Sequence, residues 1–205
     1  MRFAQPLDDA FQSRSYVKVL RALHAIPEGV DVSTREVARR AGVTHPTASG
    51  VLEQFRRQGV VRVRRTVWAD EYRVNPEHVL WGQVRSLLRW ERRVREDLLA
   101  FLTSEIVERA PWVTAAYVFG SVARGDMQPD SDIDVALICP RNRTATAKKA
   151  MESLGERTVE RFGNPVSAVV GSRPIAELSE RGRPGYRLWR MIAKEGIRLI
   201  PQDED

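Results

Sequence analysis

The sequence predicts a two-domain protein of the mixed α/β (α+β) class. Three observations support this prediction: a helix-and-hairpin pattern early in the chain, one long amphipathic helical pattern in the middle, and alternating strand-like and helical runs at the end. We therefore expect an N-terminal domain at 1–75, a linking amphipathic helix at 76–110, and a C-terminal domain with a small mixed sheet at 111–205. The chain of 205 residues is long enough for two modest cores.

The positive charge of the chain is concentrated in its N-terminal third. The net charge is +6, and residues 12–75 hold 12 Lys/Arg against 6 Asp/Glu, so the rest of the chain is balanced. This asymmetry predicts a polyanionic partner for that segment, such as duplex DNA. No apolar run approaches the roughly 20 residues that span a bilayer. The single cysteine, Cys139, permits no intrachain disulfide. We expect a cytoplasmic protein with no membrane partner.

Three helical patterns precede the hairpin. Ser15–Ala25 carries apolar residues at helical spacing, and Ser33–Glu36 is a capping box that begins a second helix. Gly42 ends that helix, and Thr44 followed by Pro46 is typical of the start of a third. Two short helices joined by a turn at Gly42 predict a helix-turn-helix.

An alternating strand pattern follows the third helix. Gly59–Arg65 alternates valines with arginines, and Glu71–Val74 supplies a return strand, so the tip of the hairpin falls near Arg65–Ala69. The order of helix, helix-turn-helix and hairpin resembles the bacterial winged-helix regulators typified by the multiple-antibiotic-resistance repressors. The resemblance covers roughly residues 12–75 and implies a DNA-binding domain.

The charge pattern and this resemblance indicate a set of DNA contacts. Short polar residues at the start of the third helix suit base edges or phosphates, and the arginines after them suit phosphates. The candidates are Thr44, His45, Thr47, Ser49, Arg56, Arg62, Arg64 and Arg65, with Arg57 as a further phosphate contact. The alternatives are a solvated basic face and a surface that docks on an acidic protein.

The middle of the chain predicts one long helix. Asn75 is expected as its N-cap and Pro76 as its first residue, and from there to Arg109 Gly82 is the single glycine and no further proline occurs. We expect a bend, if any, near Gly82. The apolar stripe consists of Leu80, Val84, Leu87, Leu88, Val94, Leu98, Leu102 and Ile106. Such a stripe can pack on the hairpin, on the C-terminal domain, or on the same helix of a second copy. We expect a homodimer in which this helix contributes to the interface.

The last 95 residues alternate strands with helices. The expected strands are Val113–Phe119, Ile133–Cys139, Pro165–Val170 and Ile197–Ile200. The expected helices are Ala145–Phe162, Ile175–Glu180 and Tyr186–Lys194. This order predicts a short sheet sandwiched by helices.

The most informative stretch runs from Tyr117 to Ile138. An apolar run is followed by Gly120 and Ser121, and a polar loop then leads to Asp132 and Asp134 at the start of a second apolar run. Side chains two residues apart on a strand share a face, so the two carboxylates project together. A carboxylate pair beside a Gly-Ser turn suits Mg²⁺ that carries a polyphosphate. The glycine lets backbone approach a phosphate, and a helix beginning near Ser121 aims N–H groups at it.

The spacing within this stretch resembles a known family. Gly120-Ser121-x-Ala123-Arg124-Gly125, ten residues between Ser121 and Asp132, and then Asp132-x-Asp134 resemble the minimal nucleotidyltransferases of the polymerase-beta-like superfamily. The resemblance covers about 111–200 and implies transfer of a nucleotidyl group from ATP or another nucleoside triphosphate. It implies catalytic, metal-binding carboxylates for Mg²⁺ (or Mn²⁺) at Asp132 and Asp134, and nucleotide contacts at Gly120, Ser121 and Arg124. The alternative is a glycine turn followed by a solvated acidic loop.

One departure from the family pattern bears on activity. Active members carry a third carboxylate on the strand after the long helix, whereas Asn164–Val170 contains no acid and Ser167 lies where the acid is expected. Three hypotheses follow. The chain is a DNA-binding nucleotidyltransferase, a transcriptional regulator whose degenerate domain senses nucleotide, or an antitoxin-like partner of a toxin or other protein acceptor.

Overall fold

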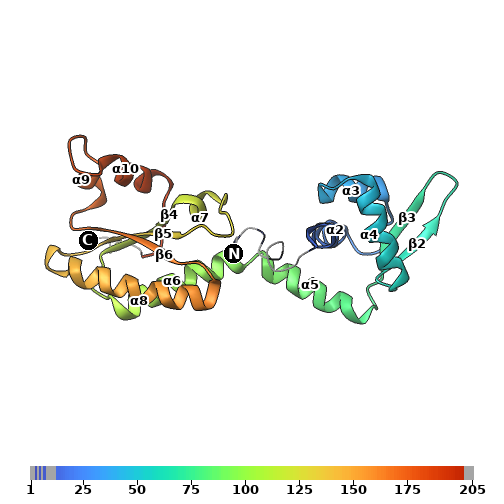
Figure 1. Ribbon diagram of the computed structural model, residues 1–205, viewed down its shortest axis with the longest axis horizontal. Coiled ribbons are helices and arrows are strands. Elements are labelled where there is room, and N and C mark those ends of the chain that lie inside the picture. Colours follow the sequence, from blue (N-terminus) through green and yellow to red (C-terminus); the bar gives the residue numbers. More distant parts are fainter. Residues whose placement is uncertain (1–2, 4, 6, 8–12, 201–205) are drawn as a thin grey trace. The chain divides into compact units, whose positions relative to one another are not determined.

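The computed structural model describes residues 3, 5, 7 and 13–200. The chain divides into two compact units, Gln5–Arg92 and Met1–Ala4 with Arg93–Asp205. Each unit combines helices with a small sheet, so the chain is of mixed α/β class (Figure 1). In the described part of the chain, no helix has the length and hydropathy that a bilayer span requires.

Two helices of the first unit begin at the N-caps that the sequence predicts, and one of them ends at the predicted glycine. Ser33 Oγ accepts the N–H of Glu36 at 3.3 Å, and Thr44 Oγ1 accepts the N–H of Thr47 at 3.3 Å. Gly42 ends the second helix with a φ of 61°, in the left-handed region. The three helices are α2 (Arg14–His24), α3 (Thr34–Ala41) and α4 (His45–Arg57). Their predicted positions are confirmed.

A three-stranded antiparallel sheet completes this unit. Its order is β1-β3-β2, with β1 at Val32–Ser33, β2 at Val61–Arg65 and β3 at Asp70–Val74. The β2–β3 hairpin pairs Val61 with Val74 and Arg65 with Asp70. The expected hairpin is therefore present, and the short strand β1 extends its sheet. The helices and sheet share one core, which includes Val19, Leu23, Val37, Leu52, Phe55, Val61 and Trp81.

The expected helix start at Asn75 and Pro76 is wrong. The Asn75 side chain accepts a hydrogen bond from Arg62 and donates one to the carbonyl of Gly59, so it fixes the end of the hairpin. Helix α5 begins three residues later and spans Val79–Glu91, with His78 as its N-cap. The Nδ1 atom of His78 accepts the N–H of Leu80 at 3.3 Å.

The single helix expected across 76–110 is also wrong, because the structure has two. After α5 a turn at Arg92-Arg93 intervenes, and α6 spans Val94–Arg109, whereas α5 continues through Gly82. Glu91, the last residue of α5, is buried and accepts two hydrogen bonds of 2.6 Å from Arg21. This pair ties the end of α5 to α2, while the apolar side of α6 enters the core of the other unit.

The second unit is built on a four-stranded sheet of order β6-β5-β4-β7. Strands β5 and β6 are parallel, and the other neighbours are antiparallel. The strands are β4 (Ala115–Phe119), β5 (Ile133–Ile138), β6 (Val166–Gly171) and β7 (Ile197–Arg198). In addition to α6, this unit contains α7 (Gly120–Arg124), α8 (Thr144–Phe162), α9 (Ile175–Leu178) and α10 (Tyr186–Glu195), with a 3₁₀ turn at Arg141–Arg143. The predicted elements are present, and β7 is shorter than Ile197–Ile200.

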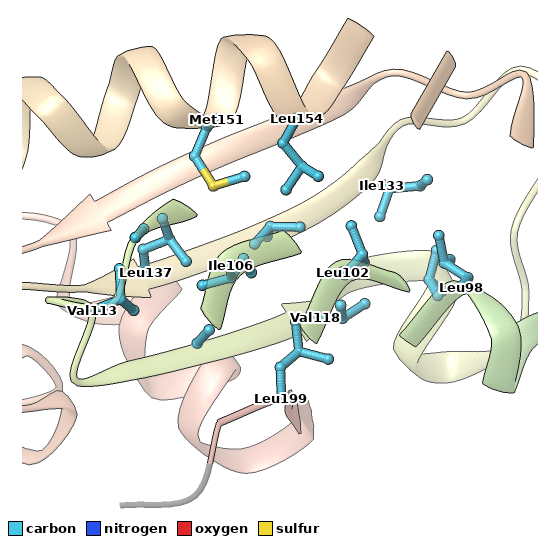
Figure 2. Packing of buried hydrophobic residues seen from close by; sticks show 14 of the residues in the cluster. Leu98, Leu102, Ile106, Val113, Val118, Ile133, Leu137, Met151, Leu154 and Leu199 are labelled. Carbon is cyan, nitrogen blue, oxygen red and sulfur yellow. The ribbon is translucent and has the colours of Figure 1, made fainter. Parts of the chain in front are cut away.

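The two faces of this sheet are covered by different helices. Helices α6 and α8 lie on one face, and α9 and α10 lie on the other (Figure 1). Figure 2 shows the first of these layers, in which α6, α8 and the sheet bury Leu98, Leu102, Ile106, Val118, Ile133, Leu137, Met151 and Leu154. On the opposite face, Tyr117, Phe119, Ala136 and Ile138 pack with Trp189 and Ile192 of α10. The alternation of side chains along β5 therefore places Asp134, two residues before Ala136, on the α10 face.

Candidate functional site

The junction between β4 and α7 brings backbone against a carboxylate. Gly120 has a φ of 67°, and a Cβ built on it would lie 2.1 Å from Oδ2 of Asp134 and 3.0 Å from its Cγ. Phe119, the residue before it, is paired with Asp134 across β4 and β5. Both the backbone conformation and the space therefore require glycine at this position.

The two predicted metal-binding carboxylates lie near each other. Asp134 is half-buried near the start of β5, and Asp132 is exposed just before that strand. Burial raises the pKa of Asp134, the negative charge of Asp132 raises it further, and Arg124 opposes both effects. The two carboxylates therefore repel each other, and a bound cation would relieve this repulsion. Carboxylate oxygens are also the ligands that Mg²⁺ prefers.

The side chain of Arg124 is already paired with a carboxylate. Its Nε atom lies 3.1 Å from Oδ2 of Asp126, and this carboxylate raises the pKa of the guanidinium. The carbonyl of Ser121 accepts the N–H groups of Gly125 and Asp126, which closes the turn after α7. A phosphate on Arg124 must therefore compete with Asp126. Both side chains are exposed, and such a pair exchanges at little cost.

Ser167 faces the carboxylate pair as expected for the missing acid. The parallel register of β5 and β6 pairs Ser167 with Asp134. Ser167 lies two residues before Val169, which packs on the α10 face, so Ser167 and Asp134 share that face. Among the described residues, no group of three or more His, Cys, Asp and Glu side chains gathers at a potential metal site. The residues present therefore fit one ion held by two carboxylates together with substrate phosphates.

The sequence analysis missed Asn164, which holds the acidic loop in place. Its side chain is fully buried, and Nδ2 donates to the carbonyls of Pro129 at 3.0 Å and Ser131 at 2.9 Å. The N–H of Ile133 donates to the carbonyl of Pro165 at 2.8 Å. The segment after α8 thus fixes the backbone on both sides of Asp132. An asparagine between Gly163 and a proline, just before a strand, was the available signal.

The candidate DNA contacts of the first unit fall into two groups. At the start of α4, His45 is exposed, whereas the hydroxyls of Thr44 and Thr47 lie 2.8 Å apart and serve the helix cap. Ser49 is half-buried one turn later. His45 is therefore an exposed candidate for a base edge that lies outside the Thr44–Thr47 cap.

Most of the candidate arginines are already paired with acids or amides. Arg56 and Arg57 share Glu53, and these bonds lower the pKa of Glu53 to about 2. Arg64 pairs with Asp31 and Glu71, and Arg62 donates to Asn75. A phosphate must displace these partners to bind the same guanidinium groups.

The tip of the hairpin differs from its stem. Arg65 is exposed, and within the described chain it has no ion pair. The adjacent tip carries Val67 and Trp68, each 94% exposed. The hydroxyl of Thr66 and the carbonyl of Ala69 close the turn beneath them at 2.6 Å. The tip therefore offers a cation together with an apolar surface.

One comparison with known proteins bears on the second unit. A family model described as the nucleotidyltransferase domain matches residues 102–179, from within α6 to the residue after α9. The matched stretch contains Gly120, Ser121, Asp132, Asp134 and Ser167. No curated protein matches the chain. The match supports a nucleotidyltransferase domain in this part of the chain.

Proposed function

We propose that the second unit binds a nucleoside triphosphate with Mg²⁺ and transfers its nucleotidyl group to an acceptor. The observation that carries this proposal is the contact between the backbone of Gly120 and the carboxylate of Asp134, with Asp132 beside it. Because position 120 has no Cβ, the backbone at the start of α7 lies against the Asp134 carboxylate, and the proposal places the phosphates on that backbone. The family match over residues 102–179 supports nucleotidyl transfer as the reaction class.

Each residue of the site has a distinct role in this proposal. Asp132 and Asp134 hold Mg²⁺ (or Mn²⁺), which when bound neutralises charge on the triphosphate of ATP or another nucleotide. Gly120 and Ser121 offer backbone to the phosphates where α7 begins. Arg124 exchanges Asp126 for a phosphate oxygen. Asn164 keeps the loop that carries Asp132 in place.

Ser167 limits the rate in this proposal. A second ion, as two-metal transfer uses, would need a further carboxylate beside Asp134 to hold it. A serine opposite Asp134 supplies neither a charge for that ion nor a base for the proton. Transfer is therefore slow, unless the acceptor or another segment supplies a carboxylate. Asp126 is a weak substitute because it lies in the turn directly after α7, in the loop proposed to hold the phosphates.

Labelled nucleotide tests this proposal. The full chain is incubated with α-labelled ATP, Mg²⁺ and a cell lysate, and the label is followed onto an acceptor. We expect slow labelling that the double variant Asp132→Asn with Asp134→Asn abolishes, and faster labelling with Ser167→Asp. Brisk labelling by the wild type that Ser167→Asp slows would contradict the role of Ser167. Nucleotide binding without labelling would favour the nucleotide-sensing regulator instead.

We also propose that the first unit is a winged-helix domain that binds duplex DNA. The supporting observation is the excess of +6 in residues 12–75, carried by a helix-turn-helix and a hairpin with an exposed arginine at its tip. Phosphate contacts dominate, so the affinity for random duplex should fall steeply as salt rises. An affinity that does not change with salt, or none for any duplex, would refute DNA binding and favour an acidic protein as the partner.

A further inference from the structure

Helix α10 and the turn before it carry an uninterrupted basic run. Residues 111–205 hold 14 Lys/Arg against 13 Asp/Glu, so this part of the chain is close to neutral as a whole. Residues 181–194, however, hold five Lys/Arg and no Asp/Glu. They cover all of α10 except its last residue, Glu195. The positive charge is therefore local to one element, and the balance of the longer stretch hides it.

Three of these cations form a stripe along one side of α10. Arg187, Arg190 and Lys194 are exposed and follow one another at intervals of three and four residues, so they share one side of the helix. We call these three residues the α10 stripe. The opposite side of the helix carries the buried Trp189 and Ile192, which pack on the sheet. The ends of the α10 stripe are seven residues apart, which corresponds to about 10 Å along a helix.

Neighbouring acids do not neutralise the α10 stripe. In α3 and α4, Glu36 and Glu53 each pair with two arginines of their own helix. Among the residues that the structure describes, no acid pairs with any member of the α10 stripe. Glu195 follows Lys194 directly, but adjacent residues on a helix do not face each other. Like charges three and four residues apart repel each other, so an anionic partner would relieve a repulsion that the fold leaves in place.

The position of the α10 stripe favours a polymer over a single nucleotide. Helix α10 covers the sheet face to which Asp134 belongs and contacts α7, which begins at Gly120 (Figure 1). The α10 stripe, however, lies on the side of the helix away from that sheet, and a helix with its side chains is about 10–12 Å across. A nucleotide whose phosphates are held at Asp134 therefore does not extend along the whole stripe, whereas a polymer can follow it.

The chemistry of this surface favours a phosphodiester backbone over an acidic protein. Arginine and lysine side chains are common donors to nucleic-acid phosphates. A protein interface instead needs an apolar centre with aromatic or methionine anchors. None of the large apolar side chains that are exposed in the described part of the chain lies between 181 and 194. The length of the α10 stripe, about 10 Å, also equals about three nucleotide steps along one strand of a duplex.

We propose that the α10 stripe is a second nucleic-acid-binding surface, which holds the phosphodiester backbone of a single strand beside the candidate functional site. Each cation contacts a phosphate, and the bases are not read, so affinity depends on charge and salt and not on sequence. The surface belongs to the second unit and shares no residue with the DNA contacts proposed for the first. The inference therefore stands or falls separately from duplex binding and from nucleotide transfer.

Fluorescence anisotropy of the full chain with a labelled single strand of about 12 nucleotides tests this inference. A single strand is used because the first unit is proposed to bind duplex, and RNA and DNA probes of one sequence show which polymer binds more tightly. The triple variant Arg187→Gln, Arg190→Gln and Lys194→Gln should weaken binding at least about tenfold and reduce the log–log salt slope by about 2, as expected for three lost phosphate contacts. Arg190→Gln alone should reduce the slope by about 0.7.

A matched triple variant separates the α10 stripe from the general charge of the unit. Arg141, Arg143 and Lys149 are exposed and have no acidic partner in the described chain, and they lie beyond the end of β5 opposite to Asp134. Their replacement by glutamine removes the same charge and should change the affinity by less than about twofold.

Several outcomes would overturn the inference. They are no binding of either polymer, equal losses for the two triple variants, or a salt slope that the α10 variants leave unchanged. Loss of Mg-ATP binding in the α10 triple variant would assign these cations to the nucleotide and would overturn it as well. Circular dichroism shows whether each variant is folded, and the single Arg190→Gln variant decides the question if the triple variant is not.

Discussion

Gly120 and Asp134 lie so close together that a Cβ at position 120 would overlap the Asp134 carboxylate unless one of them shifted. The left-handed φ of 67° adds a second requirement for glycine, because residues with a Cβ adopt this region at a cost. Close approach and backbone conformation therefore act on the same residue. The glycine of the motif is explained by the carboxylate it touches, not only by the turn it forms.

Gly120→Ala tests this explanation. The added methyl would overlap Asp134, so we expect a loss of about 1–3 kcal/mol in the free energy of unfolding, together with loss of nucleotide binding. Gly155→Ala is the matched control, because it lies within α8 and its Cβ would meet Val166 at an ordinary 3.9 Å. That control should be more stable than the wild type by about 0.5–1 kcal/mol. Urea denaturation measures both, and equal effects would refute the steric account.

Asp134→Asn should stabilise the protein while it removes the metal ligand. Burial and Asp132 raise the pKa of Asp134, so the folded protein binds this proton more tightly than the unfolded chain does. Stability is therefore highest where Asp134 is protonated and falls as the pH rises through its raised pKa.

The Asp134→Asn variant has no carboxyl group to ionise at this position, so its stability does not fall with rising pH for this reason. At pH 7 its Tm should exceed that of the wild type by about 1–4 °C, and the difference should shrink as the pH is lowered through the pKa of Asp134. Asp130→Asn, an exposed change in the same loop, should not alter the Tm. A lower Tm for Asp134→Asn at every pH would show that the carboxylate is stabilising, contrary to this account.

The sequence could predict that Gly120, Asp132 and Asp134 belong to one site, because their spacing along the chain forms a motif. It placed Ser167 correctly opposite the pair, since strand alternation and the order of elements determine the register. It missed Asn164, whose role depends on two carbonyls more than 30 residues away, at Pro129 and Ser131. It also missed the Arg124–Asp126 pair, which arises from the local shape of the turn.

At the scale of elements, the hairpin concentrates its accessible charge at the tip. Arg64 in the stem is held by Asp31 and Glu71, and Arg73 on the paired strand β3 also binds Asp31. Arg65 has no such partner among the described residues, and the turn that follows it carries the exposed Trp68. Arg65 can therefore bind a phosphate without losing an ion pair, whereas Arg64 must first give up its carboxylate partners.

Single alanine substitutions exploit this difference. Arg65→Ala should weaken binding to all duplex sequences alike and reduce the log–log salt slope by about 1, as expected for the loss of one phosphate contact. Arg64→Ala removes the same charge, and we expect a smaller change in slope because its guanidinium is already paired. Fluorescence anisotropy over a range of salt concentrations measures both slopes. A larger change for Arg64→Ala would mean that the stem, and not the tip, lies on the phosphates.

Most elements could be predicted because their signals are local. Ser33, Thr44 and Gly42 act within one turn of the helices that they begin or end. The break between α5 and α6 could not be predicted in this way. It follows from the burial of Glu91 against Arg21, 70 residues away, and from the entry of α6 into a different core.

At the scale of the whole molecule, the apolar stripe predicted across 76–110 is divided between α5 and α6, and this changes the expected dimer interface. The α6 half of the stripe is buried within the second unit, with Leu98 and Leu102 at 0% exposure. In the α5 half, Leu88 is buried, whereas Leu80 and Leu87 are exposed. Val79 and Trp90, which lie outside the stripe on the same helix, are exposed as well. If the chain forms a homodimer, α5 is therefore the part of the stripe that can contribute to the interface.

We predict a homodimer that depends on this exposed side of α5. Light scattering at tens of micromolar should give about twice the mass of the chain. Leu87→Glu should shift the population towards the monomer, because it places a charge in the buried patch. Val107→Glu is the control, since Val107 is an exposed apolar residue on α6. A monomer at this concentration, with or without DNA, would refute the prediction.

The most direct test of the central claim is calorimetric titration of the full chain with ATP in the presence and absence of Mg²⁺. The account predicts saturable binding that requires Mg²⁺ and disappears in the double variant Asp132→Asn with Asp134→Asn, while that variant remains folded. Binding that survives in the double variant would place the nucleotide elsewhere. No binding by the wild type at any Mg²⁺ concentration would contradict both the transferase and the sensor, and would leave the second unit as a scaffold.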